Sequence, residues 1–199
     1  MQNAFGHLVL VVGPSGAGKD SVLNGARAEL AGDRRFVFPR RFVTRFADAQ
    51  AEDHFSMSDM EFAIAVSKDA FALWWKAHGN SYGIGRSIEA DLEAGAVVAV
   101  NCSRSVIAEA MERFPQVTVI EITAPPHLLV QRIVARGRES EDQALARVSR
   151  QVPDYPAGAK VIRVVNDGAL IDAVDRFCEA LEALDAPPLS AVAETRLSA

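Results

Sequence analysis

The sequence has few of the features that mark membrane, secreted or metal-cluster proteins. Its 199 residues include only two cysteines, Cys102 and Cys178, too few for a disulfide framework or a zinc cluster. No apolar stretch reaches the roughly 18 residues of a membrane span. The first residues, Met1 to His7, lack the basic region that begins a signal peptide. We therefore expect a cytoplasmic protein with no membrane partner.

The sequence also has fewer basic than acidic residues. Lysine and arginine number 21 against 26 aspartate and glutamate residues, which gives a formal net charge of −5. General binding to nucleic acid depends on neutralising many phosphates, so we expect no nucleic-acid partner. A local cluster of arginines can still bind a small phosphorylated molecule. The composition therefore leaves phosphate chemistry on small molecules open.

Short apolar runs alternate with segments of helical periodicity along most of the chain. We predict buried strands at 8–12, 96–100, 117–123 and 161–165, and a further extended segment at 35–44. Helices are predicted at 19–30, 59–67, 87–93, 103–113, 126–135 and 170–184, with another between the polar span at 136–142 and about 151. This order predicts an α/β fold in which helices cover a central parallel sheet.

A glycine-rich turn joins the first predicted strand to the first predicted helix. It reads Gly13-Pro14-Ser15-Gly16-Ala17-Gly18-Lys19, which fits the phosphate-loop pattern G-x-x-x-x-G-K. Glycines let the backbone turn so that successive N–H groups point at phosphate oxygens, and the helix adds its positive dipole end. Lys19 can reach the β- and γ-phosphates. A turn without a ligand would not need this whole arrangement, so we predict ATP binding.

The loop departs from the usual pattern after its lysine. A serine or threonine usually stands there and binds Mg²⁺ through its hydroxyl group, whereas this sequence has Asp20 followed by Ser21. A carboxylate is a good ligand for Mg²⁺, directly or through water. An acid in the first turn of a helix is also favourable without a metal. We favour Asp20 as the Mg²⁺ ligand and include Ser21 in the predicted Mg·ATP site.

With this loop, the sequence resembles the guanylate kinase group of P-loop kinases from residue 8 to about 184. Further similar segments are Thr44-Arg45 followed by Glu52, Asp69-Ala70-Phe71, residues 79–83, and Val165-Asn166-Asp167. The resemblance implies a P-loop NTPase three-layer sandwich, with one kinase domain over 1–185 and a flexible tail at 186–199. It also implies a small inserted acceptor-binding lobe at about 36–84 and a helical lid at about 132–150.

The lid of this group is rich in arginine, and the matching positions here are Arg132, Arg136, Arg138 and Arg147. Arg132 and Arg136 are four residues apart, so on a helix they share a face. Planar, permanently charged guanidinium groups suit phosphates that gain charge during transfer. A solvated basic helix end is the alternative. The resemblance implies that these arginines act with Lys19 in catalysis.

Other positions depart from guanylate kinases in one direction. That group reads guanine with acidic groups, because the base presents N–H donors, but Lys76 stands at the position of the glutamate. Asn101 and Ser103 replace two acids after a core strand. With residues 44–49, 77–79 and 100–104, these changes resemble the ribose 1,5-bisphosphate phosphokinase branch, which belongs to phosphonate degradation. The resemblance implies that ATP and ribose 1,5-bisphosphate give ADP and 5-phosphoribosyl 1-diphosphate.

The same resemblance implies which side chains bind the acceptor. We expect these to be Arg41, Arg45, His54, Lys76, Tyr82 and Asn101, and His78 and Arg104 are further groups of the kind that would hold a sugar bisphosphate. Instead of binding the acceptor, Tyr82 could be an aromatic residue of the core. His54 could instead be an exposed histidine in a loop. Trp74 and Trp75 face opposite sides of a strand, so we expect one in the core and the other on the pocket wall.

Two further interpretations stay open. A guanylate kinase or another nucleoside monophosphate kinase would share the loop and the lid, although Lys76, Asn101 and Ser103 argue against guanine. A guanylate-kinase-like module that only binds proteins would not need the loop lysine and the lid arginines. The sequence identifies no second Mg²⁺ ligand, and it is compatible with a monomer or a homodimer.

Overall fold

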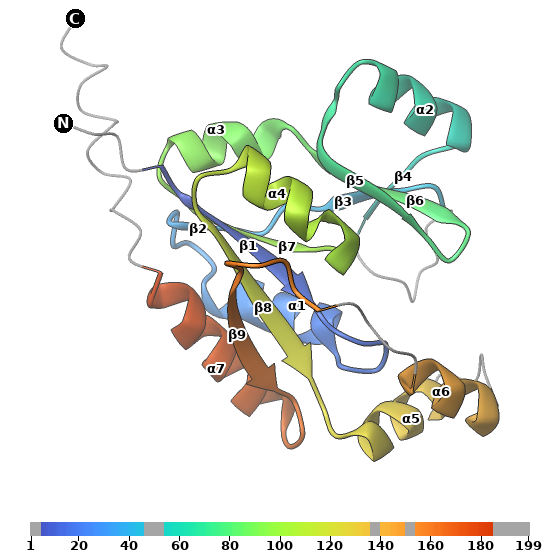
Figure 1. The fold of residues 1–199 in the computed structure, drawn as a ribbon. Helices are drawn as coiled ribbons and strands as arrows, with labels where there is room; N and C mark the ends of the chain where they lie inside the picture. Colours follow the sequence, from blue (N-terminus) through green and yellow to red (C-terminus); the bar gives the residue numbers. More distant parts are fainter. Residues whose placement is uncertain (1–4, 46–53, 136–139, 150–153, 185–199) are drawn as a thin grey trace, which may run out of the picture.

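Two sheets organise the computed structural model, which describes residues 5–45, 54–135, 140–149 and 154–184 (Figure 1). The central sheet is parallel, with the strand order β2-β7-β1-β8-β9. Its strands are β1 (His7–Val12), β2 (Phe36–Val37), β7 (Val97–Asn101), β8 (Val117–Thr123) and β9 (Lys160–Val165). Every residue from Leu8 to Val12 is buried, as expected for a strand covered on both faces. The predicted parallel α/β core is confirmed.

Helices cover both faces of this sheet and make the three layers. On one face, α1 (Lys19–Glu29) and α7 (Leu170–Glu182) pack on the side chains of Val9 and Val11. On the other face, α3 (Ser87–Glu93) and α4 (Ile107–Arg113) pack on Leu8 and Leu10. Successive side chains of a strand point to opposite faces, so one apolar run supplies both cores.

A smaller four-stranded sheet, with the order β4-β3-β6-β5, lies beside the central one (Figure 1). Its strands are β3 (Arg41–Val43), β4 (His54–Ser56), β5 (Phe71–Ala77) and β6 (Asn80–Gly85). Helix α2 (Asp59–Ser67) lies between β4 and β5 in the chain. The β5–β6 hairpin turns at His78 and Gly79, both with positive φ (50° and 77°), as a tight two-residue turn requires. The sequence analysis did not identify β4 or β6 as strands.

The prediction of one extended segment at 35–44 is wrong. Its first part forms β2 in the central sheet and its last part forms β3 in the small sheet. Pro39 lies between them and has no N–H to donate to a ladder. The break lets the chain cross from one sheet to the other, and it brings Arg41 toward the end of β7.

The remaining helices lie near the carboxyl end of β8 (Figure 1). They are α5 (Pro126–Ala135), which matches the prediction, and α6 (Glu141–Val148), which begins within the span predicted as non-helical. Ser140 and Gln143 form a capping box that fixes this start. The helix predicted at 103–113 is divided into a short 3₁₀ helix, η1 (Arg104–Val106), and α4. Among the helices that the structure describes, none is both long and apolar enough to cross a membrane.

Candidate active site

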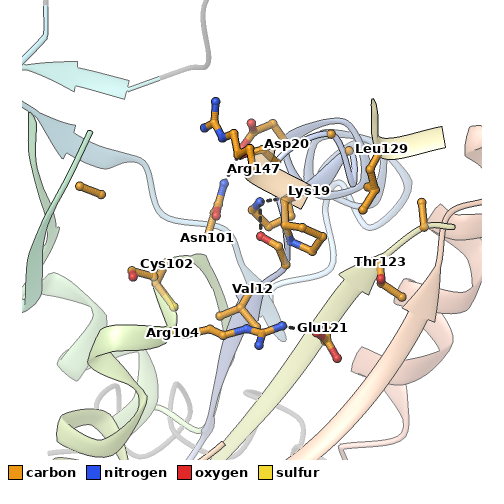
Figure 2. Close-up of a pocket in the computed structure, with 18 of the residues that line it drawn as sticks. Val12, Lys19, Asp20, Asn101, Cys102, Arg104, Glu121, Thr123, Leu129 and Arg147 are labelled. Carbon is orange, nitrogen blue, oxygen red and sulfur yellow. Dashed lines mark hydrogen bonds and ion pairs between the residues drawn. The ribbon is translucent and has the colours of Figure 1, made fainter. Parts of the chain in front are cut away.

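The carboxyl ends of β1, β7 and β8 border a cavity of about 740 Å³ (Figure 2). Ligands of parallel α/β sheets bind at this end of the strands. Residues of the phosphate loop line one wall of the cavity, residues of the small sheet line another, and α6 contributes Arg147. Figure 2 shows Arg147, Asp20 and Lys19 toward one end, with Arg104 and Glu121 toward the other.

The phosphate loop has the backbone geometry that its glycines permit. Gly13, Gly16 and Gly18 have φ values of 149°, 83° and 85°, which are unfavourable for residues with a side chain. A Cβ atom on Gly13 would lie 2.0 Å from the carbonyl oxygen of Ile122 on β8. The loop is also held by the residue that follows β9, because the buried Asn166 donates from Nδ2 to the Ala17 carbonyl oxygen at 2.8 Å. This support fixes the loop before any ligand binds.

Lys19 lies across the loop that it follows. Its Nζ donates to the carbonyl oxygens of Gly13 at 2.8 Å and Pro14 at 3.2 Å. The ammonium group is thereby held at the wall that the loop presents to the cavity. Ser21, by contrast, is exposed on α1 and is not among the residues that line the cavity.

Asp20 connects the loop to the opposite wall. Its carboxylate accepts a hydrogen bond from the side-chain amide of Asn101, and the Asn101 carbonyl oxygen accepts one from Arg41 Nη1 at 3.3 Å. Burial lowers the pKa of the Arg41 guanidinium, and the nearby Asp20 carboxylate opposes that shift. Burial also raises the pKa of the neighbouring Cys102 thiol to about 12, so this thiol stays protonated at neutral pH.

The donor set at Asp20 fits a Mg²⁺ ion that takes most of its ligands from elsewhere. Among the described residues, no three histidine, cysteine, aspartate or glutamate side chains gather as a metal site. Mg²⁺ commonly uses one or two carboxylates together with substrate phosphates and water. Asp20 lines the cavity beside the phosphate loop and can provide that carboxylate.

Tyr82 and Trp75 form the wall that the small sheet contributes. They are cross-strand partners on β6 and β5, and their rings stack with centroids 5.5 Å apart and planes 6° apart. The Arg41 guanidinium lies 5.4 Å from the centre of the Tyr82 ring. Trp75 is both buried and part of the cavity wall, whereas Trp74 is exposed on the other face beside Phe62. The prediction that divided the core and wall roles between the two tryptophans is therefore wrong.

Comparisons with known proteins identify the family. The ribose 1,5-bisphosphate phosphokinase of Bradyrhizobium diazoefficiens is 48% identical over 164 residues, which cover 82% of each chain. The chain belongs to the ribose 1,5-bisphosphate phosphokinase family. A bifunctional ribose 1,5-bisphosphokinase-thymidine phosphorylase of Cupriavidus pinatubonensis is 46% identical over 176 residues, but this chain spans only 29% of its length. No family model matches the sequence.

Comparison with solved structures identifies the fold of the chain. A guanylate kinase from Anaplasma phagocytophilum superimposes with a TM-score of 0.67, at 18% identity, over 95% of this chain and 91% of that one. Identity at this level shows the fold alone. The fold is that of the P-loop kinases, as predicted.

Lys76 is not brought to the cavity. It is exposed on β5, on the same side of the strand as Trp74, while its neighbours Trp75 and Ala77 point to the cavity side. The alternation of side chains along a strand makes this outcome unavoidable once Trp75 faces inward. Its role as an acceptor ligand stays a prediction that the geometry does not favour.

His54 and Arg45 lie next to each other and outside the lining of the cavity. His54 is only 5% exposed, and its Nε2 lies 3.3 Å from the carbonyl oxygen of Arg45. The Arg45 Nε is buried and makes no hydrogen bond with any residue that the structure describes. Neither side chain is among those that line the cavity. His54 therefore does not occupy the exposed loop position that was its alternative role.

The predicted lid arginines divide into three groups. Arg147 on α6 lines the cavity. Arg132 on α5 donates from Nη1 to the carbonyl oxygen of Asn166 at 2.9 Å and is not part of the lining. Arg136 and Arg138 lie outside the described residues, as does Glu52. The face that Arg132 and Arg136 were predicted to share is therefore not described.

Two charged residues of the cavity wall were not singled out as an ion pair by the sequence analysis. Glu121 on β8 is 8% exposed and accepts from Arg104 of η1 and, at 3.0 Å, from Arg163 Nε. The available signal was one acid inside the otherwise uncharged run 117–123. An isolated charge in a buried strand calls for a partner, but the sequence does not say from which element the partner comes.

Proposed function

We propose that this chain transfers the γ-phosphoryl group of ATP to the 1-phosphate of ribose 1,5-bisphosphate, giving ADP and 5-phosphoribosyl 1-diphosphate. An oxygen of the acceptor phosphate forms the new bond to the γ-phosphorus, and the bond to the bridging oxygen of ADP breaks. That oxygen is already ionised, so the reaction needs no catalytic base from the protein. The proposal extends the family's activity, including its role in phosphonate degradation, to this chain.

The observation that carries the proposal is the charge of the acceptor-side wall. Arg41, Asn101 and Arg104 lie there with the aromatic pair, and of the described lining residues only Asp20 and Glu121 are acidic. Both carboxylates already accept hydrogen bonds, Asp20 from Asn101 and Glu121 from two arginines. This wall suits an acceptor with several negative charges better than a base that presents N–H donors.

Each group has a proposed task in the transfer. The loop amides and Lys19 hold the β- and γ-phosphates of ATP, because phosphoryl transfer asks mainly for positioning and neutralisation of charge. Asp20, with phosphate oxygens and water, would hold a Mg²⁺ ion that neutralises charge on the transferring group. Arg147 stabilises that charge from α6, and the other arginines of the proposed lid, Arg132, Arg136 and Arg138, stay predicted to act with it. Arg41, Tyr82 and Asn101 hold the acceptor from the small sheet and β7, in the proposed acceptor lobe.

A coupled ADP-release assay with Mg·ATP tests the proposal, with ribose 1,5-bisphosphate and GMP compared as acceptors. We expect turnover with the sugar bisphosphate only, and a loss of roughly 100-fold or more in kcat for Lys19→Ala, since it removes a preorganised charge at the reacting phosphates. Lys68→Ala, at an exposed position after α2, is the matched control and should keep wild-type activity. Turnover with GMP instead would mean a nucleotide kinase, and no turnover with either acceptor would refute the substrate assignment.

A further inference from the structure

An ion-pair cluster of Glu121, Arg104 and Arg163 contributes to the charge of the cavity wall, but none of its members has been given an individual role above. Its centre is Glu121, whose register partners are Val12 on β1 and Arg163 on β9. A carboxylate this buried is costly unless it is paired and hydrogen-bonded. The structure supplies two guanidinium groups for one carboxylate, so the cluster carries a net positive charge.

The two arginines of this cluster have different surroundings. The Arg163 side chain is 71% exposed and does not line the cavity, whereas that of Arg104 is 25% exposed and does. The Arg104 guanidinium also lies 4.7 Å from the centre of the Tyr155 ring, which packs against the apolar core. An arginine has several N–H donors in a planar fork, so one edge can bond Glu121 while another faces a ligand. Arg104 is thus held between a carboxylate and an aromatic ring with its charge at the cavity.

We propose that Arg104 binds a phosphate group of the acceptor and that Glu121 is the positioning residue that holds its guanidinium toward the cavity. Arg104 begins η1, which follows β7, and lies beside Glu121 at one end of the cavity. Lys19, Asp20, Asn101 and Arg147 lie toward the other end (Figure 2). Arg104 is therefore away from the groups that we propose to hold the ATP phosphates, and for this reason we assign it to the acceptor. The inference rests on the proposed function for the identity of that acceptor.

Steady-state kinetics with each substrate varied in turn test the assignment. Arg104→Ala should raise the KM for ribose 1,5-bisphosphate roughly 10- to 100-fold, the range expected for a lost hydrogen bond to a charged group, and leave the KM for ATP unchanged. Glu121→Gln keeps the shape and one acceptor oxygen but loses the charge, so a smaller rise of roughly 3- to 10-fold is expected. Calorimetric titration of ribose 1,5-bisphosphate alone should show the same order of affinities without any turnover.

Arg113 offers a matched control, because it shares the structural features of Arg104 without lining the cavity. Its side chain is 29% exposed, pairs with Glu89 at 2.8 Å and lies 5.8 Å from the centre of the Phe114 ring. Arg113→Ala should therefore leave both KM values at wild-type levels. Equal effects of Arg104→Ala and Arg113→Ala, or a rise confined to the KM for ATP, would overturn the proposal.

A buried Glu121 that has lost Arg104 can destabilise the fold, so the double variant Arg104→Ala/Glu121→Gln removes both charges together. It should fold and still bind the acceptor weakly; wild-type affinity in this variant would refute the role of Arg104. If the wild-type enzyme turns over GMP instead of the sugar bisphosphate, the proposed function fails on its own. A KM for GMP that rises in Arg104→Ala would even then support a phosphate subsite at Arg104.

Discussion

The two sides of the cavity are built in different ways. The phosphate-loop side is continuous in sequence, from Gly13 to Asp20, and its shape comes from backbone conformations that glycine permits. The acceptor side is assembled from side chains of separate elements, and Arg41 and Asn101, which contact each other there, are 60 residues apart. The phosphate loop, which P-loop kinases share, is therefore a local structure made mainly of backbone. The acceptor side, which we propose selects the substrate, is made of side chains from elements far apart in the sequence.

The largest expected effect comes from disturbing the backbone side. Gly13→Ala would place a Cβ atom 2.0 Å from a backbone oxygen of β8, at a φ of 149°. Neither the strand nor the loop can yield at that contact, so we expect a loss of about 3–5 kcal/mol in the free energy of unfolding, the upper range for single substitutions. Chemical denaturation would measure it, and ATP binding should be lost as well.

Gly32 provides the control for this substitution. It also has a positive φ, 94°, but nothing lies within 4 Å of the position of its Cβ atom. Gly32→Ala should therefore cost only the conformational strain, about 1–2 kcal/mol. If both variants lose the same stability, the close approach to β8 is irrelevant and the loop is less constrained than its geometry implies.

The contrast between the two sides also explains what the sequence could predict. The loop, the strand before it and the helix after it were predictable because glycine positions and an apolar run act locally. The core strand 117–123 was predictable for the same reason, and it matches β8 at both ends. At these elements the determinant was local and the prediction was correct, although the local capping box that starts α6 at Glu141 was not recognised.

The non-local features were not predictable in this way. The break at Pro39 carries a local signal, but only the packing shows that the chain changes sheets there. Lys76 was assigned to the acceptor by resemblance, and the face on which it lies depends on which of two adjacent tryptophans turns inward. The partners of Glu121 come from η1 and β9, and periodicity within β8 contains no information about either.

Asp20 is the point where the two sides meet, and it gives the next largest effect. Asp20→Asn keeps the side-chain shape but removes the charge proposed to bind Mg²⁺. We expect kcat to fall roughly 10- to 100-fold, since the metal supplies several kcal/mol of charge stabilisation, and the Mg²⁺ concentration for half-maximal activity to rise. Titration of activity with Mg²⁺ at fixed ATP would measure both.

Asp172 is the matched control because it is also an acid in the first turn of a helix, α7, but is exposed and outside the cavity. Asp172→Asn should cost only a favourable interaction with the helix dipole, about 0.3–1 kcal/mol of stability, and no activity. If Asp20→Asn behaves in the same way, Asp20 is simply a first-turn acid. The Mg²⁺ role would then be wrong.

The smallest expected effects separate two faces of the small sheet. Tyr82→Phe keeps the ring stacked on Trp75 but removes the hydroxyl group, which we expect to donate to the acceptor. The KM for the acceptor should therefore rise roughly 10-fold, which is the lower end of the range for losing a hydrogen bond to a charged group. Lys76→Ala alters an exposed side chain on the other side of β5, where substitutions usually have little effect. We expect its KM to stay within about twofold of wild type at moderate salt, because Lys76 is exposed and does not line the cavity, and salt screens exposed charges. A rise that equals that of Tyr82→Phe would mean that the acceptor contacts both faces of β5, and the acceptor site would then extend beyond the residues that line the cavity.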